Sequence, residues 1–146
     1  RRLNTTKGSF YWHFEDVPAY HAALLDQWEE EANTRTETAL DEADGPVARL
    51  RRLAQMIAAR GAAFPLEPAI RAWAKDSAAA RAAVARVDDR RLALIHDLLR
   101  EIGIANPEMA RIIYAAGIGM EELGEQSAGA NGSAIGSLVD LVLALR

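Results

Sequence analysis

The stretch that organises the sequence is residues 5–14, which read TTKGSFYWHF. A threonine at position 5 or 6 can cap a helix start, because its side-chain oxygen accepts a hydrogen bond from an unpaired backbone N–H. On a helix, Phe10 and Phe14 lie four residues apart and share a face that we expect to point inward. The other faces carry hydroxyls, a lysine, a histidine and aromatic rings, with no carboxylate before Glu15. The stretch therefore predicts a short helix with one apolar and one cation-bearing side.

The outward side chains of this helix have the chemistry of a DNA-contacting surface. Lysine and histidine can contact phosphate oxygens, a glycine permits close approach, and aromatic rings can contact thymine methyl groups. An aromatic cluster at a helix start also occurs in protein cores. Residue chemistry alone therefore leaves a core role and a DNA-contacting role open.

A resemblance to a known family favours the second interpretation. The run KGSFYWHFED at residues 7–16 resembles the recognition helix and exit turn of the TetR family of bacterial one-component repressors. The preceding RRLN at residues 1–4 resembles the end of that family's second helix and its helix-turn-helix turn. The resemblance implies that the first helix and most of the second lie upstream of Arg1.

The resemblance also implies which residues contact DNA. Many family members carry a lysine near position 17 that reaches a phosphate, whereas this chain has Val17, so one expected backbone contact is missing. Trp12 could equally pack in the domain. The expected DNA contacts are Thr5, Thr6, Lys7, Gly8, Ser9, Tyr11, Trp12 and His13.

Composition indicates a helical protein with a sizeable core. The chain has 146 residues, of which 50% are hydrophobic, enough for one or two domains. Alanine and leucine dominate and β-branched runs are few, which favours helices. There is no cysteine, so neither a disulfide nor a thiolate metal site is possible. No apolar run approaches the roughly 18 residues of a membrane span, so no membrane partner is expected. The resemblance to the TetR family implies a bacterial cytoplasmic protein.

Charge is distributed unevenly along the chain. The formal net charge of −4 at first argues against nucleic acid. Residues 1–14, however, carry Arg1, Arg2 and Lys7 without an acid, whereas residues 26–44 carry mostly acids. A basic tip on an acidic body is typical of a DNA-binding regulator.

Capping residues and apolar periodicity predict the helices. Asp16 should cap a helix to about Leu40, and a second should run from Pro46 to a stop at Gly61. A short helix is expected over 69–74, followed by a long one from Asp76 or Ser77 to Gly103. The last two helices should span about 108–123 and 133–145, separated by a flexible loop over 124–132.

These elements predict an all-α fold, with a truncated helix-turn-helix head followed by a helical bundle. Residues 1–30 should hold the C-terminal part of the DNA-binding domain and the start of the linking helix. Residues 31–146 should form the regulatory, ligand-binding and dimerisation domain. Among the charged residues, Arg71 is expected to pair with Asp88 or Asp89 in a structural role. The basic face of the second helix should be solvated; its members are Arg49, Arg51, Arg52 and Arg60.

The last two helices are expected to form a homodimer. Gly117 and Gly119 would allow a close helix–helix approach, and the final helix carries apolar residues on more than one side, which indicates a partner. The TetR family pairs its last two helices with those of a second subunit in a four-helix bundle. The interface implied by this resemblance comprises Ile112, Ala116, Gly117, Met120, Leu138, Val142 and Leu145.

Large apolar side chains mark a possible effector pocket, although each of them could also be plain core. Aromatic rings and methionines together suit a flat or flexible apolar ligand, so we hypothesise a small hydrophobic effector. The candidates are Trp28, Met56, Phe64, Trp73, Tyr114 and Met120.

The sequence and its resemblance to the TetR family together predict a sequence-specific DNA-binding regulator that reads a palindromic operator. The resemblance implies a repressor that its effector releases from this operator. The alternative is a helical dimerisation or interaction module with a degenerate DNA head. An enzyme is not expected, because His13, His21 and His96 lack metal-ligand spacing and no phosphate loop or cysteine nucleophile is present. No metal or cofactor is predicted.

Overall fold

The computed structural model describes residues 16–123 and 128–146, which form seven α-helices and no strand. The predicted all-α helical bundle is therefore confirmed. No helix in these two ranges combines the length and the apolar character that crossing a membrane requires. The expected DNA-contacting residues lie outside the described residues: Thr5, Thr6, Lys7, Gly8, Ser9, Tyr11, Trp12 and His13.

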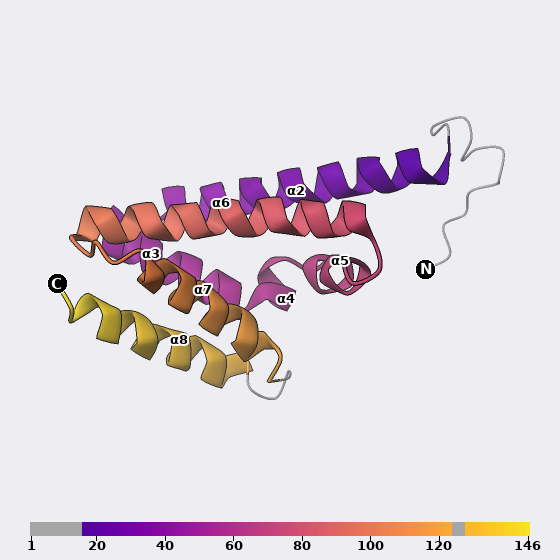
Figure 1. The fold of residues 1–146 in the computed structure, drawn as a ribbon. Helices are drawn as coiled ribbons and strands as arrows, with labels where there is room; N and C mark the ends of the chain where they lie inside the picture. The colour runs from indigo at the N-terminus through magenta and orange to yellow at the C-terminus, as the bar shows by residue number, and fades with distance from the viewer. Residues whose placement is uncertain (1–15, 124–127) are drawn as a thin grey trace.

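Two long helices run side by side along the molecule, α2 (Val17–Asp41) and α6 (Ala78–Ile102) (Figure 1). Between them in the chain lie α3 (Gly45–Ala58), the one-turn α4 (Arg60–Ala63) and α5 (Glu67–Trp73). The chain ends with α7 (Glu108–Glu121) and α8 (Ala128–Leu143). Helix α3 is central, because it packs against α2, α6, α7 and α8.

The ends of the two long helices are fixed by the residues that the sequence indicated. Asp16 Oδ1 accepts a hydrogen bond from the Ala19 amide at 2.8 Å, which caps α2. Ser77 Oγ accepts from the Ala80 amide at 3.2 Å at the start of α6. Gly103 ends α6 with φ +98°, a left-handed conformation that glycine adopts at least cost.

The apolar core is divided into two clusters. One joins α3 and the second half of α6 to α7 and α8, with Leu53, Ile95 and Ile113 at its centre. The other joins α2 and α5 to the first half of α6, and includes Trp28, Phe64 and Val87. Along α6, Val87 belongs to the second cluster and Ile95 to the first. Residues 88–94 therefore span the border between the two.

Two predicted boundaries are wrong. Gly61 does not stop a helix: α3 ends at Ala58, and Gly61 lies within α4, where its amide donates to Glu121 Oε1 at 2.7 Å. The predicted loop over 124–132 is also too long, because α8 begins at Ala128 rather than at Ser133. Asn131 is buried and its side-chain amide donates to the Met120 carbonyl at 2.8 Å. This tertiary contact outweighs the low helix propensity of the neighbouring glycines.

Candidate functional site

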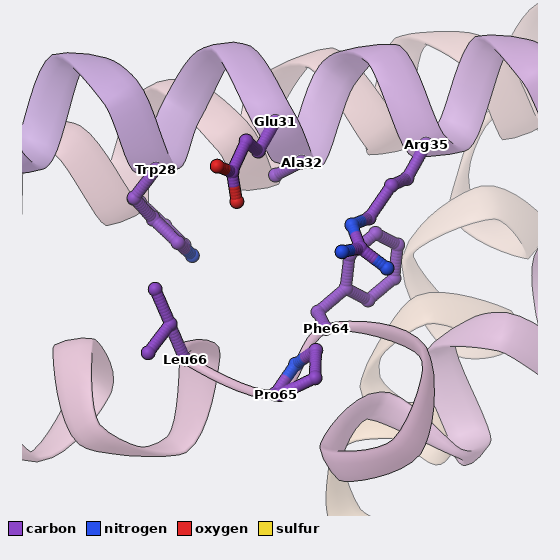
Figure 2. A pocket seen from close by; sticks show the side chains of 7 residues that line it. All are labelled: Trp28, Glu31, Ala32, Arg35, Phe64, Pro65 and Leu66. Atoms are coloured by element: carbon purple, nitrogen blue, oxygen red, sulfur yellow. The ribbon is translucent and has the colours of Figure 1, made fainter. Parts of the chain in front are cut away.

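A half-open cavity of about 150 Å³ lies between α2 and the segment that joins α4 to α5 (Figure 2). The α2 residues that line it recur at spacings of three and four, so they share one face of that helix. The opposite wall is a bend containing Pro65, which fixes the backbone beside the cavity. The lining residues are Trp28, Glu31, Ala32, Arg35, Phe64, Pro65 and Leu66.

The indole of Trp28 brings an unused hydrogen-bond donor to this cavity. Trp28 is buried, and its Nε1 has no hydrogen-bond partner among the described residues. In Figure 2 the nitrogen end of the indole points into the space between Glu31 and Leu66. A buried N–H without a partner destabilises the fold, by about 1–3 kcal/mol in protein mutational data. An acceptor atom on a bound ligand would remove this penalty.

The rest of the cavity combines an apolar floor with a charged rim. Ala32 and Phe64 are buried, whereas Glu31 and Arg35 are exposed at the rim with opposite charges. A dry cavity of about 150 Å³ is known to hold one benzene ring. The arrangement therefore fits a ligand with a single ring and one hydrogen-bond acceptor.

A cluster of ion pairs lies behind this cavity. Glu67 is 0% exposed, and its two oxygens accept from Arg91 Nη1 and Nη2 at 2.9 and 2.8 Å. Arg71 Nε donates to Glu67 Oε1 at 2.9 Å, and its two Nη atoms donate to Asp88 at 3.2 and 2.5 Å. The predicted pair of Arg71 with Asp88 is thus confirmed. The Tyr114 hydroxyl donates to Asp88 Oδ1 at 2.5 Å.

Burial and hydrogen bonding together set the proton affinities in this cluster. Burial acts to lower the pKa of Arg71, but the hydrogen bond to Asp88 and the charges of Glu67 and Asp88 outweigh burial, so its pKa is raised. Burial raises the pKa of Tyr114 to about 12, and the neighbouring carboxylate of Asp88 adds to that shift. The cluster therefore stays charged on its arginines and protonated on its tyrosine at neutral pH.

Phe64 connects the cavity to the ion-pair cluster. The guanidinium carbon of Arg91 lies 4.2 Å from the centroid of the Phe64 ring, which also lines the cavity. A ligand that shifted Phe64 would therefore disturb the packing of a buried arginine. Arg91 lies four residues after Val87 and four before Ile95, on the buried face of α6, and a charged residue in such an apolar stripe is a sequence signal that a buried partner exists.

The six predicted pocket residues do not form one pocket. Trp28 and Phe64 share the cavity beside α2. Met56 lines an adjoining groove of about 600 Å³ formed by α2, α3 and α4, which shares only Arg35 with that cavity. Tyr114 belongs to the ion-pair cluster. The other two are half-buried and line neither space: Trp73 and Met120. The sequence missed Glu31 and Arg35, although their spacing from Trp28 places them on the same helix face.

The predicted dimer residues differ in accessibility. Ile112 and Leu145 are 45% and 66% exposed, and Leu141 in α8 is 68% exposed. Gly117 is covered by its own chain, because a Cβ there would lie 2.7 Å from Ile57 Cγ2. Val142 is likewise buried within the chain. The remaining three are half-buried: Ala116, Met120 and Leu138.

One basic residue differs from its prediction. Arg60 was expected on a solvated face, but it is only 2% exposed. It lies in the one-turn helix α4, which turns its side chain toward Glu67 instead of solvent.

No group of three or more histidines, aspartates or glutamates within the described ranges could hold a metal ion. Comparison with known proteins found no matching family model, no matching curated protein and no matching solved structure.

Proposed function

We propose that the protein is a sequence-specific DNA-binding transcriptional regulator, a repressor whose operator affinity falls when a small ligand fills the cavity beside α2. The resemblance of residues 3–16 to a TetR recognition helix supports the DNA-binding part. The observation that carries the ligand-binding part is the unpartnered indole N–H of Trp28, which points into a cavity built on α2. Helix α2 begins at Val17, directly after the resembling stretch.

The cavity offers a physical route from ligand to DNA. Its walls come from α2 and from residues 64–66, so a ligand contacts two segments whose separation changes if α2 moves. A ligand changes an equilibrium only through a difference in its affinity for the two states. A ligand that fits best with α2 displaced from its DNA-binding position would release the operator.

The cavity also defines the ligand class to test. The expected effector has one ring and one carbonyl or ether oxygen that accepts from Trp28 Nε1. Acetophenone is a suitable probe, and ethylbenzene is its matched control because it has a similar shape but no acceptor. Isothermal titration should show acetophenone binding more tightly by about tenfold, the effect of about 1.4 kcal/mol from one satisfied donor.

Two variants of α2 make this ligand test specific. Ala32→Leu fills the cavity and should abolish binding of both compounds, whereas Ala23→Leu on the exposed side of the same helix should leave binding unchanged. Trp28→Phe should remove the preference for acetophenone without removing ethylbenzene. If the Ala32→Leu variant binds acetophenone as tightly as the wild type does, the pocket assignment is refuted.

DNA binding is tested separately with the intact protein. Selection from a random duplex library should yield a palindromic site, and gel shifts on that site should weaken steeply with salt. Replacing Tyr11 and His13 by alanine should lower affinity while circular dichroism stays unchanged. If the intact protein selects no sequence, the alternative of a helical dimerisation or interaction module replaces the regulator.

A homodimer is part of the proposal. The exposed apolar side chains of α7 and α8 lie on the two helices that adjoin each other at one side of the bundle (Figure 1). Leu141→Glu combined with Ile112→Glu should give a monomer in analytical ultracentrifugation. Val17→Glu is the control, because Val17 is also apolar and exposed but lies at the start of α2. Unchanged mass in the double variant would place the interface elsewhere.

A further inference from the structure

A third space, a cavity of about 790 Å³, lies between α4, α5 and the ends of α7 and α8 that meet, and it shares Ala59 and Ala62 with the groove that Met56 lines. Its volume falls within the range of about 300–1,000 Å³ that is usual for small-molecule sites. Part of its wall consists of small apolar groups, including Ala58, Ala62, Pro68 and Ala72. The cavity is distinct from the one beside α2, because the two share no lining residue.

The unusual feature of this cavity is Arg60. The residue lines the cavity yet is only 2% exposed, and its Nε and Nη1 have no hydrogen-bond partner among the described residues. The nearest carboxylate oxygens are Glu67 Oε1, 3.8 Å from Nε, and Glu122 Oε1, 3.7 Å from Nη2. Both distances exceed those of a hydrogen bond. A buried guanidinium whose N–H groups lack acceptors destabilises the fold, so a hydrogen-bond acceptor placed beside Arg60 would be stabilising.

Neighbouring carboxylates cannot satisfy Arg60. Both oxygens of Glu67 already accept from Arg91, and one of them also accepts from Arg71. With Asp88 included, the cluster holds three guanidinium groups, those of Arg60, Arg71 and Arg91, and two carboxylates, Glu67 and Asp88. Both carboxylates accept hydrogen bonds from Arg71 or Arg91, so the acids left to face Arg60 are the glutamates at the end of α7.

The two glutamates at the end of α7 differ in how they are held. Glu121 Oε1 accepts from the Gly61 amide at 2.7 Å, so this oxygen already has a partner. The Glu122 side chain is 79% exposed and only approaches Arg60. An exposed, loosely placed carboxylate contributes little to a pair and can be displaced by a better-placed anion.

We propose that this cavity binds an organic carboxylate, whose acid group replaces Glu122 as the partner of Arg60. A guanidinium presents parallel N–H donors that match the two oxygens of a carboxylate. The alanine and proline wall then accommodates the apolar part of the molecule. Lys75, which lines the exposed edge, adds a second positive charge. This site rests on its own contacts and stands whether or not the protein binds DNA.

Octanoate is the probe, and octan-1-ol is the neutral control with the same chain length. Titration calorimetry and thermal unfolding of the wild-type chain should show octanoate binding at least tenfold more tightly than octan-1-ol. Arg60→Met should remove this preference and leave octan-1-ol binding unchanged. A purely structural role of Arg60 would instead weaken both ligands together. Equal affinity of the wild type for the two probes would overturn the proposal.

A second variant keeps the test decisive if Arg60→Met does not fold. Glu122→Gln changes an exposed side chain and removes the competing carboxylate, so octanoate affinity should rise about two- to fivefold by the loss of a weak ion pair. If Glu122→Gln binds octanoate more weakly than the wild type does, octanoate does not displace Glu122 from Arg60. The Ala32→Leu variant should bind octanoate normally; loss of binding there would place octanoate in the cavity beside α2 and overturn the assignment.

Discussion

Replacing Glu67 by glutamine should reveal how strongly the interior depends on one carboxylate. Glutamine has nearly the same shape but carries no charge, and it presents an NH2 group where the glutamate has an accepting oxygen. Two arginines currently donate to this side chain at 2.8–2.9 Å, and a third lies 3.8 Å away. The substitution would leave these guanidinium groups facing a neutral amide at a site that is 0% exposed.

The expected loss of stability is large. Breaking a buried ion pair by removing one partner costs about 3–5 kcal/mol, because the remaining charge stays buried. Small domains have total stabilities of about 5–15 kcal/mol, so Glu67→Gln is expected to be close to unfolding. With a denaturant dependence of about 2 kcal/mol per M, the urea midpoint should fall by about 2 M.

Urea unfolding followed by far-UV circular dichroism at pH 7 measures this change. Glu37→Gln is the matched control, because Glu37 pairs with Arg90 on the surface and both side chains are about half exposed. The control should lose less than about 1 kcal/mol. Combining Glu67→Gln with Arg91→Met should cost less than the sum of the single changes, since the second removes a charge that the first strands. A loss below about 1 kcal/mol for Glu67→Gln would refute the reasoning.

Three further predictions concern a proton, a packing contact and a cap. Because folding raises the pKa of Tyr114 to about 12, its stabilising contribution is complete below pH 10 and is lost as the pH rises to 12. The unfolding free energy of the wild type should therefore fall by about 2–3 kcal/mol relative to Tyr114→Phe over that interval, and parallel pH profiles would contradict this. Gly117→Ala should lower the thermal midpoint, because its Cβ would lie 2.7 Å from Ile57 Cγ2, whereas Gly119→Ala meets nothing within 4 Å and should raise it by the helix propensity of alanine. If both substitutions shift the thermal midpoint in the same direction, the close contact at Gly117 is disproved. Asp16→Ala should cost about 1 kcal/mol in urea unfolding by removing the 2.8 Å cap hydrogen bond, and no change would mean that the cap contributes nothing.

The sequence was sufficient for the helices whose ends are set locally. Asp16, Ser77 and Gly103 act on their own helix ends, so residue type predicted the start of α2 at Asp16 and the end of α6 at Gly103, and narrowed the start of α6 to Asp76 or Ser77. The sequence did not predict the helix boundaries that depend on a contact with a distant part of the chain. Gly61 is helical and bonded to Glu121, 60 residues away, and the start of α8 is anchored through Asn131.

The candidate sites were less predictable than the fold, because they depend on which faces meet. Trp28 and Phe64 were both predicted as pocket residues, but only the packing of residues 64–66 against α2 brings them together. The burial of Arg60 depends on the break between α3 and α4, which no local signal indicated. The expected dimer residues came from the family resemblance and from the apolar faces of the last two helices, and neither distinguishes Gly117, covered by its own chain, from the exposed Ile112.

The position of the cavity along α2 has a geometric consequence. The first buried residue of α2 is Leu25, so residues 17–24 contribute no buried side chain to the core. Trp28 lies twelve residues after the capping residue Asp16, which corresponds to about 18 Å along the helix axis at a rise of 1.5 Å per residue. A 10° tilt about Trp28 would displace the start of the helix by about 3 Å. In the proposed DNA-binding dimer, the two symmetric heads would change their separation by about 6 Å, which is large compared with the roughly 34 Å spacing of successive major grooves. A ligand that moves α2 by a fraction of an ångström at the cavity would therefore shift the far end of the helix by several ångströms. That shift would take the two heads out of register with successive major grooves.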